Sequence, residues 1–234
     1  MFQGKKKAIT FSYDDGVTQD IRLVEIFNKY DLKATFNLNS MLLGKDGRIS
    51  SPYGEASHNK VKREDVPKIY AGHEVAVHTC THPLLPSLDE PEIIAQVEDD
   101  RRNLEDLVGY PVVGMAYPGG GVNNDDRVAE VIRSHTAVQY ARTTTETRCF
   151  DAQSNLYRFH PTVYHLHFDT LFSLADEFLS QEYTEPKIFY IWGHSYEFDY
   201  QDTWGRFEEF CKRIAHREDV FYGTNRQVLL GMDF

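Results

Sequence analysis

The feature that most constrains the fold of this chain is a regular alternation between short apolar runs and longer amphipathic stretches. Seven runs have the length and the β-branched or aromatic content of strands, at residues 8–13, 34–38, 74–77, 112–117, 138–141, 188–192 and 220–222. Five stretches have helical periodicity, at residues 18–30, 91–108, 125–134, 170–180 and 203–216. Strands that alternate with helices pair in parallel through right-handed crossovers, so the pattern predicts an α/β fold.

Repetition of the strand–helix unit suggests a barrel, which need not be complete, and an open doubly wound sheet is the alternative. The 234 residues suit one α/β domain, so we expect residues 1–234 to form a single domain. Thr18 is a candidate cap for the first helix, and Ser87 and Pro91 mark the start of the second. Residues 46–63 are polar and rich in turn formers, which predicts a long excursion from the α/β pattern.

Composition narrows the range of partners. The formal net charge is −11, which disfavours binding to nucleic acid or to an anionic membrane surface. No run approaches the roughly 20 apolar residues of a membrane-spanning helix. The first seven residues carry three lysines and no apolar signal core, so we expect a cytoplasmic protein unless a leader has been removed. Three widely spaced cysteines fit reduced thiols, and the sequence leaves the oligomeric state open.

Chemically capable side chains follow four of the predicted strands. They are Asp14 and Asp15 after the first strand, His78 after the third, residues 117–119 after the fourth, and His194 after the strand at 188–192. In parallel α/β folds the carboxyl ends of the strands meet at one edge, and active sites lie there. The fold would therefore gather these groups into one site.

Residues 78–83 (HTCTHP) hold two histidines four residues apart. Residues at this spacing share one face of a helix, but Pro83 disfavours helical geometry at His82, so we expect a turn after the strand. A tight turn can still direct the rings of His78 and His82 at one metal ion. Taken alone, the pair could equally be two unrelated loop histidines.

Residues 10–16 (TFSYDDG) place two adjacent carboxylates at a strand end. Neighbouring side chains of a strand point to opposite faces, but a turn into Gly16 lets both carboxylates reach one site. One carboxylate could complete a metal site with the two histidines and leave the other free for proton transfer. By itself, the Asp-Gly pair could simply mark a turn before a helix.

His194 lies in residues 190–195 (YIWGHS), directly after an apolar strand. Histidine suits proton transfer near neutral pH, although this residue alone would more often be structural. Residues 117–121 (YPGGG) form a glycine-rich turn that lacks the sequence of a nucleotide-binding loop. We interpret the turn as a place where a backbone N–H can approach a substrate oxygen closely.

Together these motifs resemble those of the polysaccharide deacetylase family, the NodB-homology fold of carbohydrate esterase family four. The similarity extends from Ile9 to about Thr224, and residues 10–16 and 78–83 carry its two most specific motifs. The resemblance implies a distorted (β/α) barrel with about seven parallel strands and a divalent metal, most often Zn²⁺. The implied partner is an N-acetylated carbohydrate.

The resemblance also implies roles for single residues. Asp15, His78 and His82 would bind the metal, Asp14 would be the general base, Gly119 would supply the backbone N–H of an oxyanion hole, and His194 would be the general acid. Zinc held by two histidines and one carboxylate keeps a position open for water and lowers the pKa of that water. Protonation by a histidine assists the departure of the amine.

The chain departs from the family pattern in three places, and one of them is Gly119, which stands where the third motif has an aromatic residue. The third motif usually carries an arginine where this chain has Ala116, and we expect Arg142, after the next strand, to replace it beside the base. The Asp-Trp unit of the fourth motif, which orients the acid histidine, has no evident counterpart. Three aspartates remain candidates for that role, namely Asp151, Asp169 and Asp176.

Several side chains near the strand ends could line a groove for a sugar. We expect substrate contacts from Tyr117, Asn39, Trp192 and Tyr196. Three further histidines, His160, His165 and His167, could form a second metal site. A strand or loop with exposed histidines is the favoured interpretation of that cluster.

The leading hypothesis is a metal-dependent hydrolase that removes an acetyl group from an N-acetylated sugar or oligosaccharide. The alternative is hydrolysis of another non-peptide C–N bond, as in a cyclic amide or ureide, which the change at Ala116 keeps open. A site of two histidines and one carboxylate can also hold Fe(II) for oxygen chemistry, but generally in β-helix folds. A catalytically inactive carbohydrate-binding protein is disfavoured by the presence of Asp14 and His194.

Overall fold

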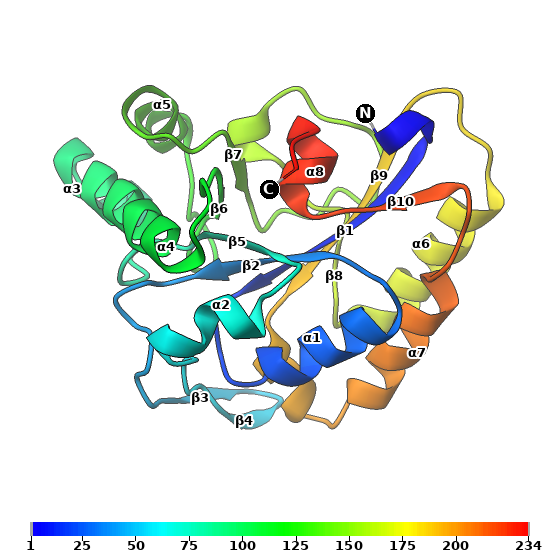
Figure 1. The fold of residues 1–234 in the computed structure, drawn as a ribbon, viewed down its shortest axis with the longest axis horizontal. Coiled ribbons are helices and arrows are strands. Elements are labelled where there is room, and N and C mark those ends of the chain that lie inside the picture. The colour runs from blue at the N-terminus through cyan, green and yellow to red at the C-terminus, as the bar shows by residue number, and fades with distance from the viewer. Residues whose placement is uncertain (1, 234) are drawn as a thin grey trace.

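The structure, a computed structural model, describes residues 2–233. Its main sheet has eight parallel strands in the order β7-β6-β5-β2-β1-β9-β8, with β10 beside the first residues of β1 (Figure 1). Their bounds are β1 Lys7–Asp14, β2 Ala34–Leu38, β5 Glu74–Val77, β6 Gly114–Ala116, β7 Tyr140–Arg142, β8 Val163–Tyr164, β9 Lys187–Gly193 and β10 Val220–Tyr222. The expected parallel α/β architecture is confirmed.

The sheet curls until one chain segment connects its two edges. The N–H of Phe159 donates to the carbonyl of Ala141 in β7, at 2.9 Å. The N–H of Thr162 donates to the carbonyl of Tyr190 in β9, at 2.8 Å. Residues 159–164, which include β8, therefore join β7 to β9, and the fold is the distorted barrel rather than the open sheet.

Helices surround this curled sheet (Figure 1). They are α1 Asp20–Lys29, α2 Val66–Ile69, α3 Glu90–Ile94, α4 Asp100–Val108, α5 Asp126–His135, α6 Phe168–Ser180, α7 Trp204–Ile214 and α8 Asn225–Leu230. A π-helical turn, η4 (Ala95–Asp99), joins α3 to α4, so the second predicted helix is one continuous but locally widened element. Within residues 2–233, no helix has the length and apolar character needed to cross a membrane.

Two predicted helix caps are wrong, although both helices begin within two residues of the expected positions. Helix α1 begins at Asp20 without a side-chain cap, and the N–H of Thr18 instead donates to the carbonyl of Asn59, at 2.8 Å. The second helix is capped by Asp89, whose carboxylate accepts from the N–H of Glu92, rather than by Ser87. In both places a serine or threonine met the sequence rule for a cap, but tertiary contacts or a nearby carboxylate took precedence.

The excursion at residues 46–63 contains an antiparallel hairpin that the sequence did not predict. Its strands are β3 (Arg48–Ser51) and β4 (Gly54–Ser57), which form a separate two-stranded sheet. Most of their side chains are polar and partly exposed, so neither strand shows an apolar alternation. The hairpin lies outside the barrel (Figure 1), and the chain leaving it returns to the strand ends.

Strand β1 separates an apolar layer from a polar interior because its side chains alternate between two faces. Phe11 and Tyr13 point to the helices and place their ring centroids 4.7 and 5.8 Å from that of Phe27. Ser12 and Asp14 point to the barrel interior, where both accept hydrogen bonds from the side-chain amide of Asn37. The barrel interior therefore carries polar groups up to the rim.

The part of the barrel interior near the amino ends of the strands is also polar, and its polar side chains hydrogen-bond to one another. Glu74 is fully buried, and its carboxylate accepts from the hydroxyl of Thr35 at 2.7 Å, the hydroxyl of Tyr140 at 2.9 Å and the N–H of Arg226 at 2.9 Å. Burial raises the pKa of Glu74 above its usual range. These partners fix the strands from within, which gives the rim a rigid base.

His73 makes the stability of the fold sensitive to acid. It is buried, accepts from the N–H of Ala34 at 3.2 Å and lies 3.1 Å from the side-chain oxygen of Asn28. Burial lowers its pKa to about 4, against about 6.5 in an unfolded chain. The unfolded chain therefore takes up a proton first, so this contribution is complete above pH 6.5 and is lost as the pH falls towards 4.

The predicted loss is about 3 kcal/mol of unfolding free energy across that interval. We expect the stability difference between the wild type and His73→Gln to shrink by that amount between pH 7 and pH 4, because the variant cannot titrate at this position. Urea unfolding at several pH values measures the difference. A difference that does not change with pH would contradict the prediction.

Candidate active site

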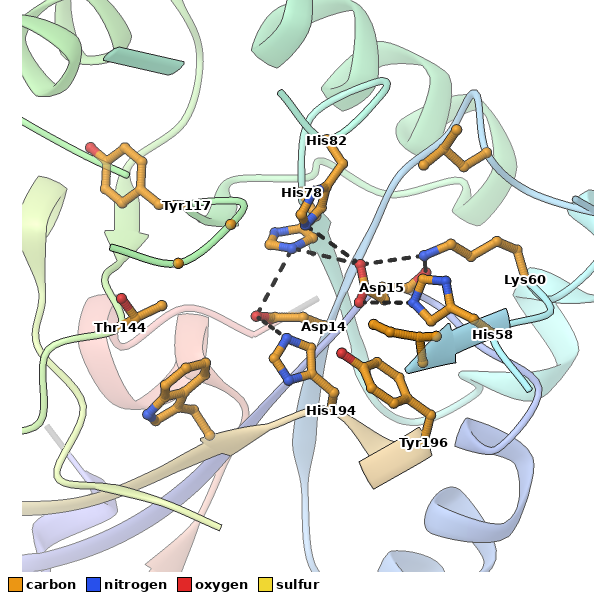
Figure 2. Close-up of a pocket in the computed structure, with 15 residues that line it drawn as sticks. Asp14, Asp15, His58, Lys60, His78, His82, Tyr117, Thr144, His194 and Tyr196 are labelled. Carbon is orange, nitrogen blue, oxygen red and sulfur yellow. Dashed lines mark hydrogen bonds and ion pairs between the residues drawn. The ribbon is translucent and has the colours of Figure 1, made fainter. Parts of the chain in front are cut away.

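The carboxyl ends of the strands surround a cavity of about 570 Å³ (Figure 2). The residues that line it include Asp14, Asp15, His58, Lys60, His78, His82, Tyr117, Gly119, Trp192, His194 and Tyr196. Of the side chains predicted from the sequence, all but Asn39 and Arg142 line this cavity. The strand ends therefore bring together groups that lie up to 180 residues apart in the chain.

Asp15, His78 and His82 form a group that could hold a metal ion, with ligand atoms within 4.8 Å of one another. Nε2 of His82 and Nε2 of His78 lie 3.7 and 4.0 Å from Oδ1 of Asp15. Nδ1 of His78 lies 2.9 Å from the carbonyl oxygen of Ala116 and must donate to it. This contact fixes the tautomer that leaves Nε2 with a free electron pair.

The surroundings of His78 fit a bound cation. Its Nε2 atom is buried and has no hydrogen-bond partner among the described residues. Burial lowers the pKa of His78 to about 4, so the ring is neutral at physiological pH. A buried, neutral, unpartnered imidazole nitrogen beside a carboxylate is the donor set that a divalent metal prefers.

The backbone is held in an uncommon conformation at two of the candidate ligands and at Thr79, which lies between the two histidines. Asp15, Thr79 and His82 have φ angles of 82°, 68° and 65°, in the left-handed region that non-glycine residues seldom adopt. Such strain occurs at functional sites when surrounding contacts enforce it. The residues between His78 and His82 form a turn, as predicted, rather than a helix.

Contacts from α3–α4 and β2 enforce this turn. The π-helical turn frees the carbonyl of Gln96, which accepts from the N–H of Cys80 at 3.0 Å. The carboxylate of Asp100 accepts from the N–H of His78 at 3.1 Å. The side-chain amide of Asn39 donates to the carbonyls of His78 and Thr79, at 2.6 and 3.0 Å. Asn39 thus supports the turn from below the cavity.

Asp14 lies next to Asp15 but has different partners. Nη2 of Arg142 lies 2.5 Å from Oδ2 of Asp14, and the amide of Asn37 donates to Oδ1 at 2.8 Å. Arg142 is fully buried, and its guanidinium stacks 4.5 Å from the ring centre of Trp192. Arg142 is also the register partner of Ala116 in the β6–β7 pair. Arg142 therefore lies at the same level of the sheet as Ala116, one strand over.

His194 faces Asp14 across the cavity (Figure 2) and has a carboxylate partner that sequence analysis missed. Its Nε2 lies 3.8 Å from Oδ2 of Asp14, and its Nδ1 lies 3.0 Å from Oε2 of Glu197. Burial alone would lower the pKa of His194, but the charges of Glu197 and Asp14 outweigh it and raise that pKa to about 9. His194 is therefore held in its protonated form at neutral pH.

Glu197 is shared with a second histidine. Oε2 of Glu197 lies 2.9 Å from Nε2 of His165, whose Nδ1 lies 3.2 Å from the hydroxyl of Tyr13. His165 is fully buried, so the expectation that it is exposed is wrong. A Cβ on Gly193 would lie 2.2 Å from the His165 ring, which explains why glycine precedes His194.

The three aspartates considered as partners of His194 lie elsewhere. Asp151 pairs with Lys187, Asp169 with Arg206, and Asp176 with Arg213. His160 and His167 also have separate partners, Thr143 and Glu146, and within residues 2–233 only one group of potential metal ligands forms. The second metal site considered above is therefore absent from the part of the chain that the structure describes.

The glycine-rich turn borders the cavity as predicted. Gly119 has φ of 80°, and a Cβ there would lie 2.6 Å from Leu84, so a side chain is excluded. The N–H of Tyr117 donates to the carbonyl of Arg142, and its hydroxyl donates to the carbonyl of Tyr157 at 2.8 Å. Tyr117 is fully buried, and its ring points away from the candidate metal ligands (Figure 2).

Three cavity residues, Ile49, His58 and Lys60, come from the excursion and were not predicted. Lys60 and His58 both contact Asp15 (Figure 2). Neither carries a sequence signal, because they lie in a polar stretch without periodicity. Glu197, by contrast, follows His194 by three residues, and that spacing could have suggested the contact.

A family model described as polysaccharide deacetylase matches residues 3–139, more than half of the chain. The chain therefore belongs to the polysaccharide deacetylase family. It is 30% identical over 128 residues to the peptidoglycan-N-acetylglucosamine deacetylase PgdA of Listeria monocytogenes, which covers 54% of this chain and 24% of the relative. The chain thus spans about a quarter of the length of that curated relative.

Two solved structures are similar to the fold. One is the peptidoglycan deacetylase PdaC from Bacillus subtilis, with a TM-score of 0.57 and 18% identity, over 96% of this chain and 90% of that chain. The other is BA3943, a CE4 family pseudoenzyme from Bacillus anthracis, with a TM-score of 0.54 and 19% identity, over 97% and 66% of the two chains. At these identities the likeness supports the fold alone.

Removal of one candidate ligand should weaken metal binding sharply. We expect His78→Ala to lower the affinity for Zn²⁺ by more than about 100-fold, since even outer partners of a metal are each worth about 10- to 100-fold. Isothermal titration calorimetry on chelator-treated protein measures the change. The matched control is His167→Ala, an exposed histidine outside the cavity, which should bind as the wild type does. Equal loss in both variants would count against the assignment.

Proposed function

We propose that the protein is a metal-dependent hydrolase that removes the acetyl group from an N-acetylated sugar or oligosaccharide. The observation that carries the proposal is the pairing of a metal-ligand group with a free carboxylate and a protonated histidine in one cavity. Hydrolysis of an amide needs all three: an activated water, a base and an acid. Membership of the polysaccharide deacetylase family supports an acetylated glycan as the substrate class.

Asp15, His78 and His82 would hold the cation. A divalent ion in this donor set, most fittingly Zn²⁺, supplies a Lewis acid that activates water and polarises an acetyl carbonyl. The chain itself supplies the remaining steps. Gly119 lines the cavity, where its backbone N–H would stabilise the negative charge that develops on the carbonyl oxygen.

Asp14 is the candidate general base. It adjoins the ligand group, but its carboxylate is held by Arg142 and Asn37 rather than by the histidines of that group. Arg142 fixes the direction of the carboxylate, because Arg142 is itself buried against the ring of Trp192. Asp14 can therefore accept a proton from the attacking water.

His194 is the candidate general acid. Glu197 holds the imidazolium through Nδ1, so Nε2–H points to the side of the cavity where Asp14 lies. A protonated ring at that place can give its proton to the departing amine, which leaves poorly without one. Base and acid thus lie next to each other, 3.8 Å apart, at the place where the scissile amide would bind.

Replacement of the base tests the proposed reaction. We expect Asp14→Asn to lower the rate of acetate release from N-acetylglucosamine oligomers by about 10² to 10⁴, since a positioned base contributes that much. A screen with single N-acetyl sugars, oligomers and a cyclic imide separates the lead function from hydrolysis of other C–N bonds. Chelator treatment should remove activity, and added Zn²⁺ should restore it. Unchanged turnover in Asp14→Asn would contradict the proposed role of Asp14 as the general base.

Replacement of Glu197, the partner of His194, tests the proposed role of His194 as the general acid. Glu197 raises the pKa of His194, so Glu197→Gln should shift the alkaline limb of the pH profile of kcat/KM to lower pH. Below that limb, where His194 is still protonated, the loss of rate should be smaller than at pH 8. Glu146→Gln is the matched control, because Glu146 pairs with the exposed His167. An alkaline limb that stays in place would argue against the role of Glu197.

A further inference from the structure

Lys60 occupies an unusual place for a lysine. Its side chain is buried, with 7% of the residue exposed, and it lines the cavity beside the candidate metal ligands. Nζ lies 3.3 Å from Oδ1 of Asp15 and donates to the backbone carbonyl of the same residue at 2.7 Å. Oδ1 is also the Asp15 oxygen nearest to His82 and His78. A fixed positive charge thus shares the oxygen that a cation would bind.

The chain around Lys60 holds the ammonium group in place. Residues 59–61 run antiparallel to the segment that follows Asp15, with Lys60 bridged to Val17. The N–H of Val61 donates to the carbonyl of Gly16 at 2.9 Å, and the N–H of Thr18 donates to that of Asn59 at 2.8 Å. These backbone contacts place Lys60 beside Asp15, and the hydrogen bond from Nζ to the Asp15 carbonyl holds the ammonium group there.

His58 secures the other oxygen of the same carboxylate. Its Nε2 lies 3.2 Å from Oδ2 of Asp15, and its ring packs edge-on against Tyr196 with centroids 5.0 Å apart. Because His58 contacts Oδ2, the oxygen of Asp15 that remains for a metal ion is Oδ1, the same oxygen that lies beside Lys60. The excursion therefore determines how Asp15 is presented to the histidines.

We propose that Lys60 is a built-in counter-ion of Asp15, which holds the carboxylate in place in the metal-free protein and lowers the affinity of the site for a divalent cation. The proposal rests on the metal site of the proposed function. A bound cation would lie close to the ammonium group, and like charges in a buried site repel strongly. Lys60 thereby lowers the affinity for the metal ion, but it keeps the empty site in the binding geometry, so that the metal can be released and bound again.

Charge can be separated from hydrogen bonding by substitution. Lys60→Gln keeps a donor for the Asp15 carbonyl but removes the charge, Lys60→Met removes both, and Lys60→Arg keeps the charge. Lys62→Gln is the matched control, because Lys62 is exposed two residues further on. Chelator-treated proteins are titrated with Zn²⁺ alone in competition with a chromophoric chelator, and thermal unfolding is followed with and without Zn²⁺.

We expect Lys60→Gln and Lys60→Met to bind Zn²⁺ at least tenfold more tightly than the wild type. Their metal-free forms should unfold at lower temperature, and Zn²⁺ should raise that temperature by more than it does in the wild type. Lys60→Arg and Lys62→Gln should behave as the wild type. Circular dichroism identifies which neutral variant remains folded, and either one decides the test.

Two different failures are distinguishable. If a folded neutral variant binds Zn²⁺ no more tightly than the wild type, the counter-ion proposal is overturned and the metal site stands. If the wild type and every variant bind no Zn²⁺, the metal-dependent reaction itself fails. Because the readouts are affinity and unfolding temperature, neither outcome depends on knowing the substrate.

Discussion

The structure depends on the burial of two neighbouring carboxylates at the end of one strand. Asp14 is 2% exposed and Asp15 is 6% exposed, although each carries a charge that would cost several kcal/mol to bury alone. Adjacent like charges repel, so each needs its own partners. Arg142 supplies the positive charge for Asp14 from the barrel interior, and Lys60 supplies that for Asp15 from the excursion. The different roles proposed for the two aspartates follow from this difference in partners.

The polar barrel interior is what allows Arg142 to reach Asp14. A guanidinium cannot cross an apolar core, but the side chains of β1, β2 and β5 that face inward already form hydrogen bonds, as Glu74 and Asn37 illustrate. The stack of Arg142 on Trp192 provides a second contact without removing its charge. The helices then bury the apolar faces of the same strands, so stability and chemistry occupy opposite sides of one sheet.

Alternating apolar runs and two short motifs were enough to predict the parallel strands, the edge at which the site lies and nine of the fifteen residues that line its cavity. They were enough because strand direction and side-chain alternation are local properties of the sequence. Parallel pairing then brings the residues at the carboxyl ends of different strands next to one another. Arg142 was also predictable, since it ends the strand next to that of Ala116. Lys60 and His58 were not, because contacts of an excursion with a distant strand end leave no periodic trace. His165 was misjudged because its neighbours Tyr164 and His167 are more exposed, and only the tertiary contact with Glu197 explains its burial.

The charges around the cavity also bear on which substrate it suits. Three carboxylates, Asp14, Asp15 and Glu197, are each matched by one cation, namely Arg142, Lys60 and protonated His194. The three pairs cancel before any metal binds, so the cavity exerts little net attraction on an anionic or a cationic group. For the proposed deacetylation, this balance means that an uncharged acetamido group would enter the site without displacing a counter-ion. A free amine product would find no unpaired carboxylate there to hold it.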